Sequence, residues 1–238
     1  MPKWDSLSVF LPSFNEQENL EDTVAQARKF LKNAVKDWEL IIVDDGSKDK
    51  TGIIADRLAK KDIHLRVIHN RPNRGYGGAL QAGYYSSKKA WIAFTDADGQ
   101  FDISELNLFF ANQRQTGADA VIGYYISRSV SKTVIFTSKI WEFIVFILFG
   151  LKIKDIDCGL KLLSKNIIDT IPHLEAERGA FISSELLIKT QKSGFKITEV
   201  GVHHYPRKGG KATGRNLKVI IGSFIDLFKL WWKLSWVN

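Results

Sequence analysis

The 238 residues include a single cysteine, Cys158, so the chain cannot form an internal disulfide. We expect this cysteine to pack in the core and not to act as a nucleophile. The first residues also lack the apolar segment of a signal peptide. Both absences predict a cytoplasmic protein, because a reducing compartment keeps thiols free.

Long apolar runs are absent as well. The most hydrophobic stretch, residues 133–151, is interrupted by Lys139 and Glu142, which leaves only residues 143–151 without a charge. A helix needs roughly 20 apolar residues to cross a bilayer. We therefore expect a buried or interfacial helix at this position.

Sequence signatures of several binding classes are missing too. The five histidines show no metal-ligand spacing, and there is no zinc motif, RNA-binding motif or heptad zipper. A dinucleotide fingerprint should follow the first strand, but that position reads PSFNE, and the GK[ST] sequence of a P-loop is absent. We therefore expect no nucleic-acid partner and neither of these two phosphate-binding loops.

Positive charge is concentrated near the C-terminus. Of the net charge of +8, residues 206–238 contribute +6, and the last eight residues hold three of the seven tryptophans. Such a segment suits nucleic acid, anionic lipid or a phosphorylated substrate. We divide the chain into an α/β domain, residues 1–205, and a basic loop with a Trp-rich amphipathic helix, residues 206–238.

Strand and helix patterns alternate along the first hundred residues. Alternation of this kind predicts βαβ units, and hence an α/β fold with a mostly parallel sheet flanked by helices. Later in the chain, separate strands and helices are expected. The predicted strands are 7–11, 40–43, 65–68, 91–95, 120–123 and 196–203, and the predicted helices are 19–36, 51–60, 79–87, 133–151, 183–192 and 217–232.

The most informative stretch is WIAFTDADGQF, residues 91–101. Its apolar part predicts a buried strand, and Asp96 and Asp98 follow where that strand ends. Open α/β sheets place their ligands at the carboxyl ends of their strands. A divalent cation would relieve the repulsion between two carboxylates, and ligation by oxygen alone favours Mg²⁺ or Mn²⁺. An isolated pair of this kind equally fits an acidic turn with solvated carboxylates.

Three other strand ends carry polar or glycine-rich sequences: PSFNE at 12–16, VDDGS at 43–47 and NRGYGGAL at 73–80. Asp44 or Asp45 could accept hydrogen bonds from a nucleotide base or ribose. In the alternative, the acidic turn only caps a helix, a role that Ser47 or Asp49 could also fill. The glycines allow the backbone to approach a ligand, and Arg74 could face a phosphate.

In this order, the four motifs resemble those of the family 2 glycosyltransferases of the GT-A fold, and more closely the polyprenyl-phosphate (dolichol-phosphate) hexosyltransferases. The second half agrees with this resemblance. Arg128 follows GYYIS, DIDCGLKLL spans 155–163 with Leu160 where Phe is usual, and HHYPRKGGKATG spans 203–214. Phe14, Lys211 and Ala212 depart from the family pattern.

The resemblance implies a nucleotide-sugar site and a metal site. Mg²⁺ or Mn²⁺ would sit on Asp96, Asp98 and Gln100 and bridge the donor diphosphate as a Lewis acid and template. The nucleotide sugar, of the GDP-mannose or UDP-glucose type, would be bound by one set of residues from several loops. That set is Pro12, Phe14, Glu16, Asp44, Asp45, Gly75 and Asp96.

The resemblance also implies a polyprenyl phosphate acceptor and an inverting transfer. A lipid phosphate is already ionised near neutral pH, so it needs cations that hold it in line with the anomeric carbon more than it needs a base. Asp96, Asp98, Arg128 and Arg207 are the predicted catalytic residues. The acceptor phosphate would be held by Arg128, Ser138, Arg207 and Lys211, with Lys132 as a further candidate.

A lipid acceptor requires contact with a membrane. Residues 133–151 and the Trp-rich C-terminus predict peripheral association with the cytoplasmic face, although both could instead pack on the sheet or on a second subunit. Two other functions stay open. One is transfer to a soluble saccharide with Asp155 or Asp157 as the base, and the other is a non-catalytic module that binds nucleotide or membrane.

Overall fold

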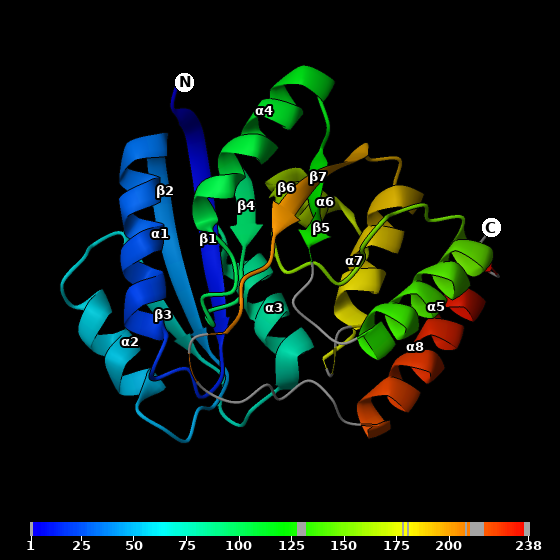
Figure 1. Cartoon of the computed structure of the whole chain (residues 1–238), viewed down its shortest axis with the longest axis horizontal. Helices are drawn as coiled ribbons and strands as arrows, with labels where there is room; N and C mark the ends of the chain where they lie inside the picture. Colours follow the sequence, from blue (N-terminus) through cyan, green and yellow to red (C-terminus); the bar gives the residue numbers. More distant parts are fainter. Residues whose placement is uncertain are drawn as a thin grey trace.

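The computed structural model describes residues 2–127, 132–177, 179, 181–207, 209 and 217–235. Within these residues, seven strands form one sheet in the order β3-β2-β1-β4-β6-β5-β7, with helices on both faces (Figure 1). This arrangement confirms the predicted α/β fold. The strands are β1 Trp4–Ser13, β2 Val35–Asp44, β3 Leu65–His69, β4 Trp91–Phe94, β5 Ala120–Ser127, β6 Lys161–Ser164 and β7 Ile197–His203. The helices are α1 Leu20–Ala34, α2 Thr51–Ala59, α3 Gly75–Ser86, η1 Ile103–Glu105, α4 Leu106–Thr116, α5 Lys132–Phe149, α6 Lys165–Thr170, α7 Phe181–Lys192 and α8 Leu217–Ser235.

The strand order brings the ends of the first four strands to one edge. β1 pairs in parallel with β2 and β4, and β2 pairs in parallel with β3. The chain therefore runs outward from β1 to β3 and then crosses to β4 on the other side of β1. The switch in direction lies between β1 and β4, which is where open α/β sheets bind their ligands.

The sheet is mixed beyond β4. β6 runs antiparallel to both β4 and β5, whereas β7 is parallel to β5. The sequence did not reveal β6, because this short strand carries the charged Lys161 at a fully buried position. The helices α4 and α6 were not predicted either, and α3 begins four residues before the predicted helix, at the glycine-rich motif.

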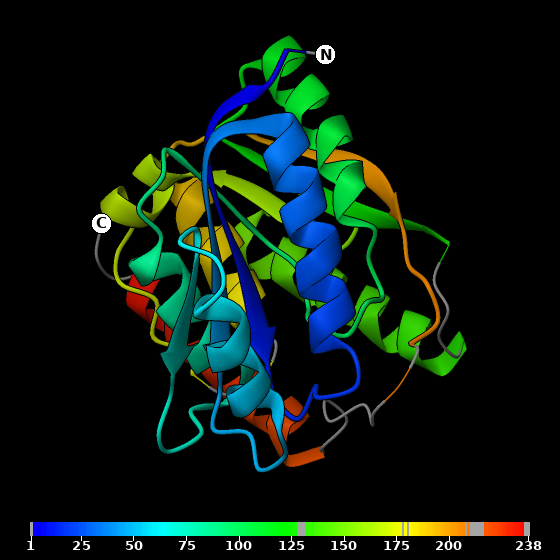
Figure 2. The ribbon, with the colours of Figure 1, turned by 90° about the vertical axis from the view of Figure 1, so that its left-hand side faces the viewer.

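Two layers of helices bury the two faces of the sheet. On one side, α1, α2 and α4 cover a core that includes Leu7 and Val9 of β1, and α1 contributes Leu20, Val24 and Leu31 at helical spacing. On the other side, α3, α6 and α7 cover a core that includes Phe10. Figure 2 shows α1 and α4 on one side of the sheet and α3 on the other. Since residues 7–13 of β1 are buried on both faces, this part of the strand is mostly apolar and does not alternate between apolar and polar residues.

Helices α5 and α8 form an outer pair that lies beyond α7 (Figure 1). Trp141 of α5 donates a hydrogen bond from Nε1 to Ser184 Oγ of α7 at 2.9 Å. Its ring also meets Phe224 of α8 edge-on, with centroids 5.1 Å apart. In the described part of the chain, no helix is both long and apolar enough to cross a membrane.

The close packing of α3 on β1 gives a stability prediction. A Cβ on Gly83 would lie 2.2 Å from Cδ2 of the buried Phe10 ring. Gly83→Ala should therefore lower the free energy of unfolding in urea by about 1–3 kcal/mol, because an overpacked core must shift. Gly222→Ala is the matched control, since a Cβ on Gly222 of α8 meets nothing within 4 Å. Equal stability of the Gly83→Ala variant and its parent would contradict the described packing.

Candidate nucleotide-sugar site at the strand ends

The loops after β1 and β2 are joined to each other by hydrogen bonds. Asn15 N donates to Ser47 Oγ at 3.0 Å, and Lys48 N donates back to Asn15 Oδ1 at 2.8 Å. Glu16 N donates to Thr51 Oγ1 at 2.8 Å. Asn15 has a φ of 56°, a left-handed conformation that Asn tolerates better than most residues. The motifs PSFNE and VDDGS therefore form one wall of the site.

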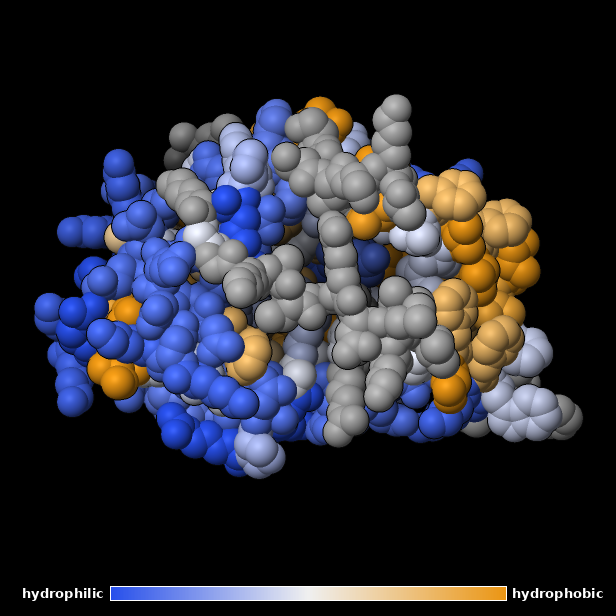
Figure 3. All heavy atoms as spheres, turned by 60° about the horizontal axis from the view of Figure 1, so that its bottom comes forward, coloured by the Kyte–Doolittle hydropathy of each residue, from blue (hydrophilic) through white to orange (hydrophobic). Residues whose placement is uncertain are grey.

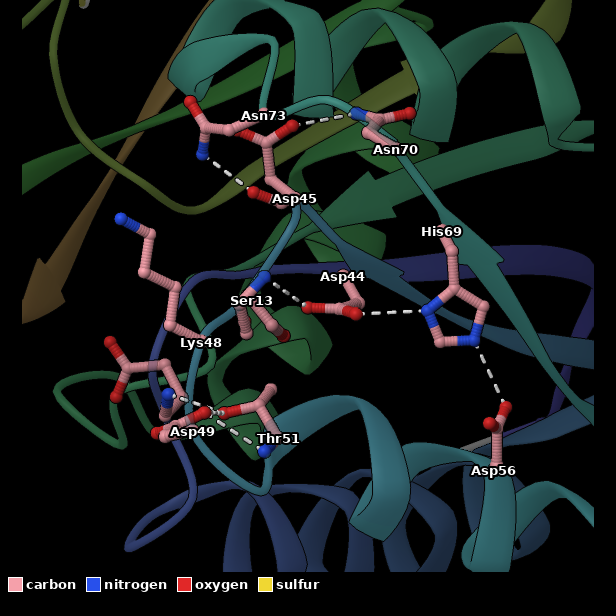
Figure 4. A network of polar contacts seen from close by, with 12 residues as sticks. Ser13, Asp44, Asp45, Lys48, Asp49, Thr51, Asp56, His69, Asn70 and Asn73 are labelled. Carbon is pink, nitrogen blue, oxygen red and sulfur yellow. Dashed lines mark hydrogen bonds and ion pairs between the residues drawn. The ribbon is translucent and has the colours of Figure 1, made fainter.

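Both carboxylates of VDDGS are buried and already have partners (Figure 4). Asp44 accepts a hydrogen bond from Ser47 N at 3.1 Å and contacts His69 Nδ1 at 2.8 Å. Asp45 Oδ1 accepts from Asn70 Nδ2 at 2.8 Å and from Arg74 N at 3.0 Å. These contacts hold both carboxylates inside the loop after β2, so the two side chains fix the shape of that loop.

The glycine-rich start of α3 is fixed by a segment from the second half of the chain. Gly78 N donates to Glu177 O at 2.8 Å, and a Cβ on Gly77 would lie only 2.3 Å from Ala176 O. Only glycine allows this approach without a shift. Arg74, which by its sequence position could face a phosphate, pairs with Glu177 at 2.6 Å. Gly75 begins the helix with a φ of 79°.

The carboxylates of Asp96 and Asp98 lie just beyond β4, as the sequence predicted. Burial, together with the Asp98 charge, raises the pKa of Asp96 to about 7. Burial also raises the pKa of Asp98. Tyr76 of α3 donates a hydrogen bond from its hydroxyl to Asp96 Oδ1 at 3.1 Å. These raised pKa values show that the negative charge of the pair is incompletely compensated.

Arg207 reaches this acidic pair from the segment that follows β7. Its Nη2 donates to Glu16 Oε1, and its Nη1 lies 3.6 Å from Asp98 Oδ2. Two hydrogen bonds hold the segment along the DADGQF loop. Tyr205 N donates to Gln100 O at 2.9 Å, and Gln100 Nε2 donates to Tyr205 O at 3.0 Å. Residues about 190 positions apart in the sequence therefore share one site.

The segment DIDCGLKLL lies behind the acidic pair. A Cβ on Gly159 would lie 2.8 Å from Asp96 Oδ2, so glycine leaves room for that carboxylate. Lys161 is fully buried and donates from Nζ to Cys158 O. Burial lowers the pKa of Lys161, and the charges of Asp157, Asp155 and Asp96 oppose that shift. Cys158 is buried and burial raises its pKa to about 12, as expected of a thiol in the core.

The remaining predicted residues fall into two groups. Pro12 is buried in β1, Phe14 is partly buried just after it, and Ser138 lies on α5. Arg128 and Lys211 lie outside the described residues, and so does the side chain of Lys132. Tyr76 and Lys161 were not predicted as site residues, although Tyr76 lies in NRGYGGAL and Lys161 in DIDCGLKLL.

The acidic pair is suited to a cation that takes its remaining ligands from a substrate. Asp96, Asp98 and Gln100 offer oxygen ligands, and uncompensated negative charge is what a divalent cation would neutralise. Among the described residues, however, no group of three or more Asp, Glu, His or Cys side chains could hold a metal ion by itself. Mg²⁺ commonly uses one or two carboxylates together with substrate phosphates, so this donor set fits such a site.

Comparison with known proteins identifies the family. Residues 8–171 match the family described as Glycosyl transferase family 2. The chain belongs to this family. It is therefore a glycosyltransferase, and the acidic pair lies within the matched region.

Individual relatives agree with this assignment. The dolichyl-phosphate beta-glucosyltransferase of Homo sapiens is 31% identical over 231 residues, which cover 87% of this chain and 71% of that protein. Glycosyltransferase AglD of Haloferax volcanii is 26% identical over 96% of this chain, but the match spans only 37% of AglD. A crystal structure of glucosyl-3-phosphoglycerate synthase from Mycobacterium tuberculosis superposes with a TM-score of 0.67, covering 94% of this chain and 78% of that one. At 21% identity, that similarity shows the fold, of GT-A type.

The contact between Tyr76 and Asp96 can be tested directly. Tyr76→Phe removes the donor that stabilises the ionised carboxylate, so the pKa of Asp96 should rise further above about 7. The measurement is a pH titration of the carboxyl carbon by NMR. Tyr85→Phe is the control, because that hydroxyl lies on the same helix but accepts from Leu174 N. An unchanged or lower pKa in the Tyr76→Phe variant would remove Tyr76 from the site.

Proposed function

We propose that this glycosyltransferase transfers a hexose from a nucleotide sugar of the UDP-glucose type to a polyprenyl phosphate, with inversion and with Mg²⁺ or Mn²⁺. One observation supports a lipid as the acceptor. An exposed apolar face, formed by α5 and α8, lies next to the edge of the sheet at which the first four strands end. The family assignment supports transfer of a glycosyl group. The named dolichyl-phosphate relative supports glucose as the transferred sugar.

Donor binding uses the acidic pair and the joined loops. Asp96, Asp98 and the amide oxygen of Gln100 would hold the cation, which when bound neutralises the diphosphate leaving group. Glu16 and the wall formed by residues 12–16 and 43–47 would hold the nucleoside, with Asp44 and Asp45 setting the shape of that wall. The first turn of α3, which begins at Gly75, would lie beside the diphosphate.

Arg207 is the described cation best placed for an acceptor phosphate. It is partly buried, and it already lies against two carboxylates, Glu16 and Asp98. Once a divalent cation neutralises the acidic pair, the guanidinium has less negative charge to balance and can turn to a phosphate in bidentate geometry. The phosphate needs no strong base, so transfer depends on its alignment with the anomeric carbon. Arg128, Ser138 and Lys211 remain candidates for the same cradle.

The apolar face is defined by eight exposed side chains. On both α5 and α8 they recur at helical spacing. In Figure 3 apolar residues gather over this part of the molecule, whereas the side formed by α1 and α2 is polar. The eight are Phe136, Ile140, Phe143, Phe146, Ile147, Ile225, Phe228 and Trp232.

Basic residues border the apolar face. Lys139, Lys229 and Lys233 have side chains that are 57%, 74% and 57% exposed. Apolar side chains beside lysines suit the boundary between headgroups and acyl chains. Trp231 packs partly against the core, so Trp232 is the exposed tryptophan on the described part of this helix, while Trp236 lies outside the described residues. We infer that the face rests on a membrane and that the cytoplasmic side supplies the nucleotide sugar.

The transfer itself is tested with labelled donors. UDP-glucose and GDP-mannose, each with Mn²⁺ or Mg²⁺, are incubated with polyprenyl phosphate or with soluble saccharides, and butanol-soluble label is counted. We expect label from UDP-glucose to enter the lipid fraction only with polyprenyl phosphate and a divalent cation. Asp98→Asn should abolish it while leaving the urea midpoint close to that of the parent. Label found only on a saccharide, or no transfer from either donor, would contradict the proposal.

The membrane contact gives a separate prediction. Phe143→Ser combined with Ile147→Ser and Phe228→Ser should shift the protein from sedimenting anionic vesicles to the supernatant, because burial of each large apolar side chain contributes about 1.5–3 kcal/mol. The control carries Ile53→Ser and Ile63→Ser, two residues that are 72% and 98% exposed elsewhere on the molecule. Equal partition of both variants and the parent would place the membrane contact elsewhere. A lower oligomeric mass of the triple variant would identify a subunit interface instead.

A further inference from the structure

His69 joins two elements on either side of the candidate nucleoside wall. It ends β3, and its Nδ1 lies 2.8 Å from Asp44 Oδ2 at the end of β2. Its Nε2 lies 3.0 Å from Asp56 Oδ1 in α2. Figure 4 shows the ring between the two carboxylates. The imidazole therefore bridges the start and the end of the segment 44–56.

This segment includes the loop that forms the wall. Asp44 accepts from Ser47 N, and Ser47 in turn accepts from Asn15 N of the neighbouring loop. A shift of the Asp44 carboxylate would therefore be transmitted to the loop after β1 through these two hydrogen bonds. Gly52 leaves room for this arrangement, because a Cβ there would lie 2.8 Å from Asp44 Oδ2.

The charge state of His69 decides whether the bridge is complete. A neutral imidazole has one N–H and can donate to only one of the carboxylates, whereas an imidazolium donates to both. Among the described residues, Asp44 from β2 and Asp56 from α2 are the charged groups that face the ring. Burial lowers the pKa of His69, but the hydrogen bonds and charges of the two aspartates outweigh it and raise the pKa above its usual value.

We propose that His69 is a positioning residue for the nucleotide sugar: its doubly protonated ring clamps Asp44 to Asp56 and so holds the nucleoside wall in its binding shape. The contribution of His69 to nucleotide-sugar affinity is then greatest when both ring nitrogens carry protons, and this contribution falls as the pH rises through the titration of His69. This inference rests on the proposed function for the assignment of the wall, but it concerns binding and not transfer.

The test is calorimetric titration of UDP-glucose into the full chain with Mn²⁺, between about pH 5 and about pH 8. The diphosphate diester of this ligand keeps one charge state over that range. At low pH the parent should bind about fivefold more tightly than His69→Asn, as expected for a modest coupling between two sites, and at high pH the two affinities should converge. His69→Asn keeps a neutral donor near Asp44 and loses the charge, so it lacks only the contribution of the imidazolium.

Two further variants separate this role from simple packing. Asp56→Asn removes one of the carboxylates that favour the imidazolium, so the fall in affinity should move to lower pH. His64→Gln is the control, since His64 is exposed and precedes the opposite end of β3. Asp96 titrates in every variant, so the difference between the parent and His69→Asn isolates His69. Nitrogen NMR of the ring should show both nitrogens protonated at low pH.

The outcomes distinguish this inference from the proposed function. The same pH dependence in the parent and in His69→Asn, or a ring that is neutral at low pH, would overturn the clamp. Binding with the expected pH dependence but without transfer would contradict the proposed reaction and leave the clamp standing. A chain that binds no nucleotide sugar at any pH would overturn both.

Discussion

The repulsion between the buried carboxylates of Asp96 and Asp98 is the constraint on which the site depends. Two like charges in a poorly solvated place are costly unless a cation lies close. Here the pKa of Asp96 is about 7, and the guanidinium of Arg207 lies 3.6 Å from Asp98. The pair is therefore held in a state that favours cations, and the divalent metal that would accompany the donor diphosphate is the cation that the family reaction would supply.

The groups that surround this pair of carboxylates come from distant regions of the chain. Parallel pairing of β1, β2 and β4 brings their ends to one edge, and the segment after β7 returns to that edge through Gln100 and Tyr205. Gly159 leaves the space that the Asp96 carboxylate occupies. Lys161 lies fully buried behind the pair, where burial lowers the pKa of its amino group. The outer helices α5 and α8 pack on α7 and on each other, and the large apolar side chains on their outer side are exposed.

Much of this could be predicted from sequence, because strand ends in a parallel sheet carry their ligands in fixed places. Asp96 and Asp98 were located by the apolar run that precedes them, and Cys158 was correctly expected in the core. Three-dimensional contacts that depend on side-chain direction could not be predicted. The hydroxyl of Tyr76 points to Asp96 only because α3 starts at Gly75, and Arg74 pairs with Glu177, which is remote in sequence. The strand β6 could not be predicted either, because it is short and its buried lysine interrupts the apolar pattern expected of a strand.

The most direct test of the central claim is the position of the metal. Crystals grown with Mn²⁺ and UDP would be measured at the manganese absorption edge, so that anomalous scattering locates the ion. We expect a peak at coordination distance from the Asp98 carboxylate, between β4 and the diphosphate, with the Arg207 guanidinium moved away from Asp98. A peak at another place, or a bound diphosphate with Arg207 still against Asp98 and no metal, would show that the acidic pair does not hold the metal.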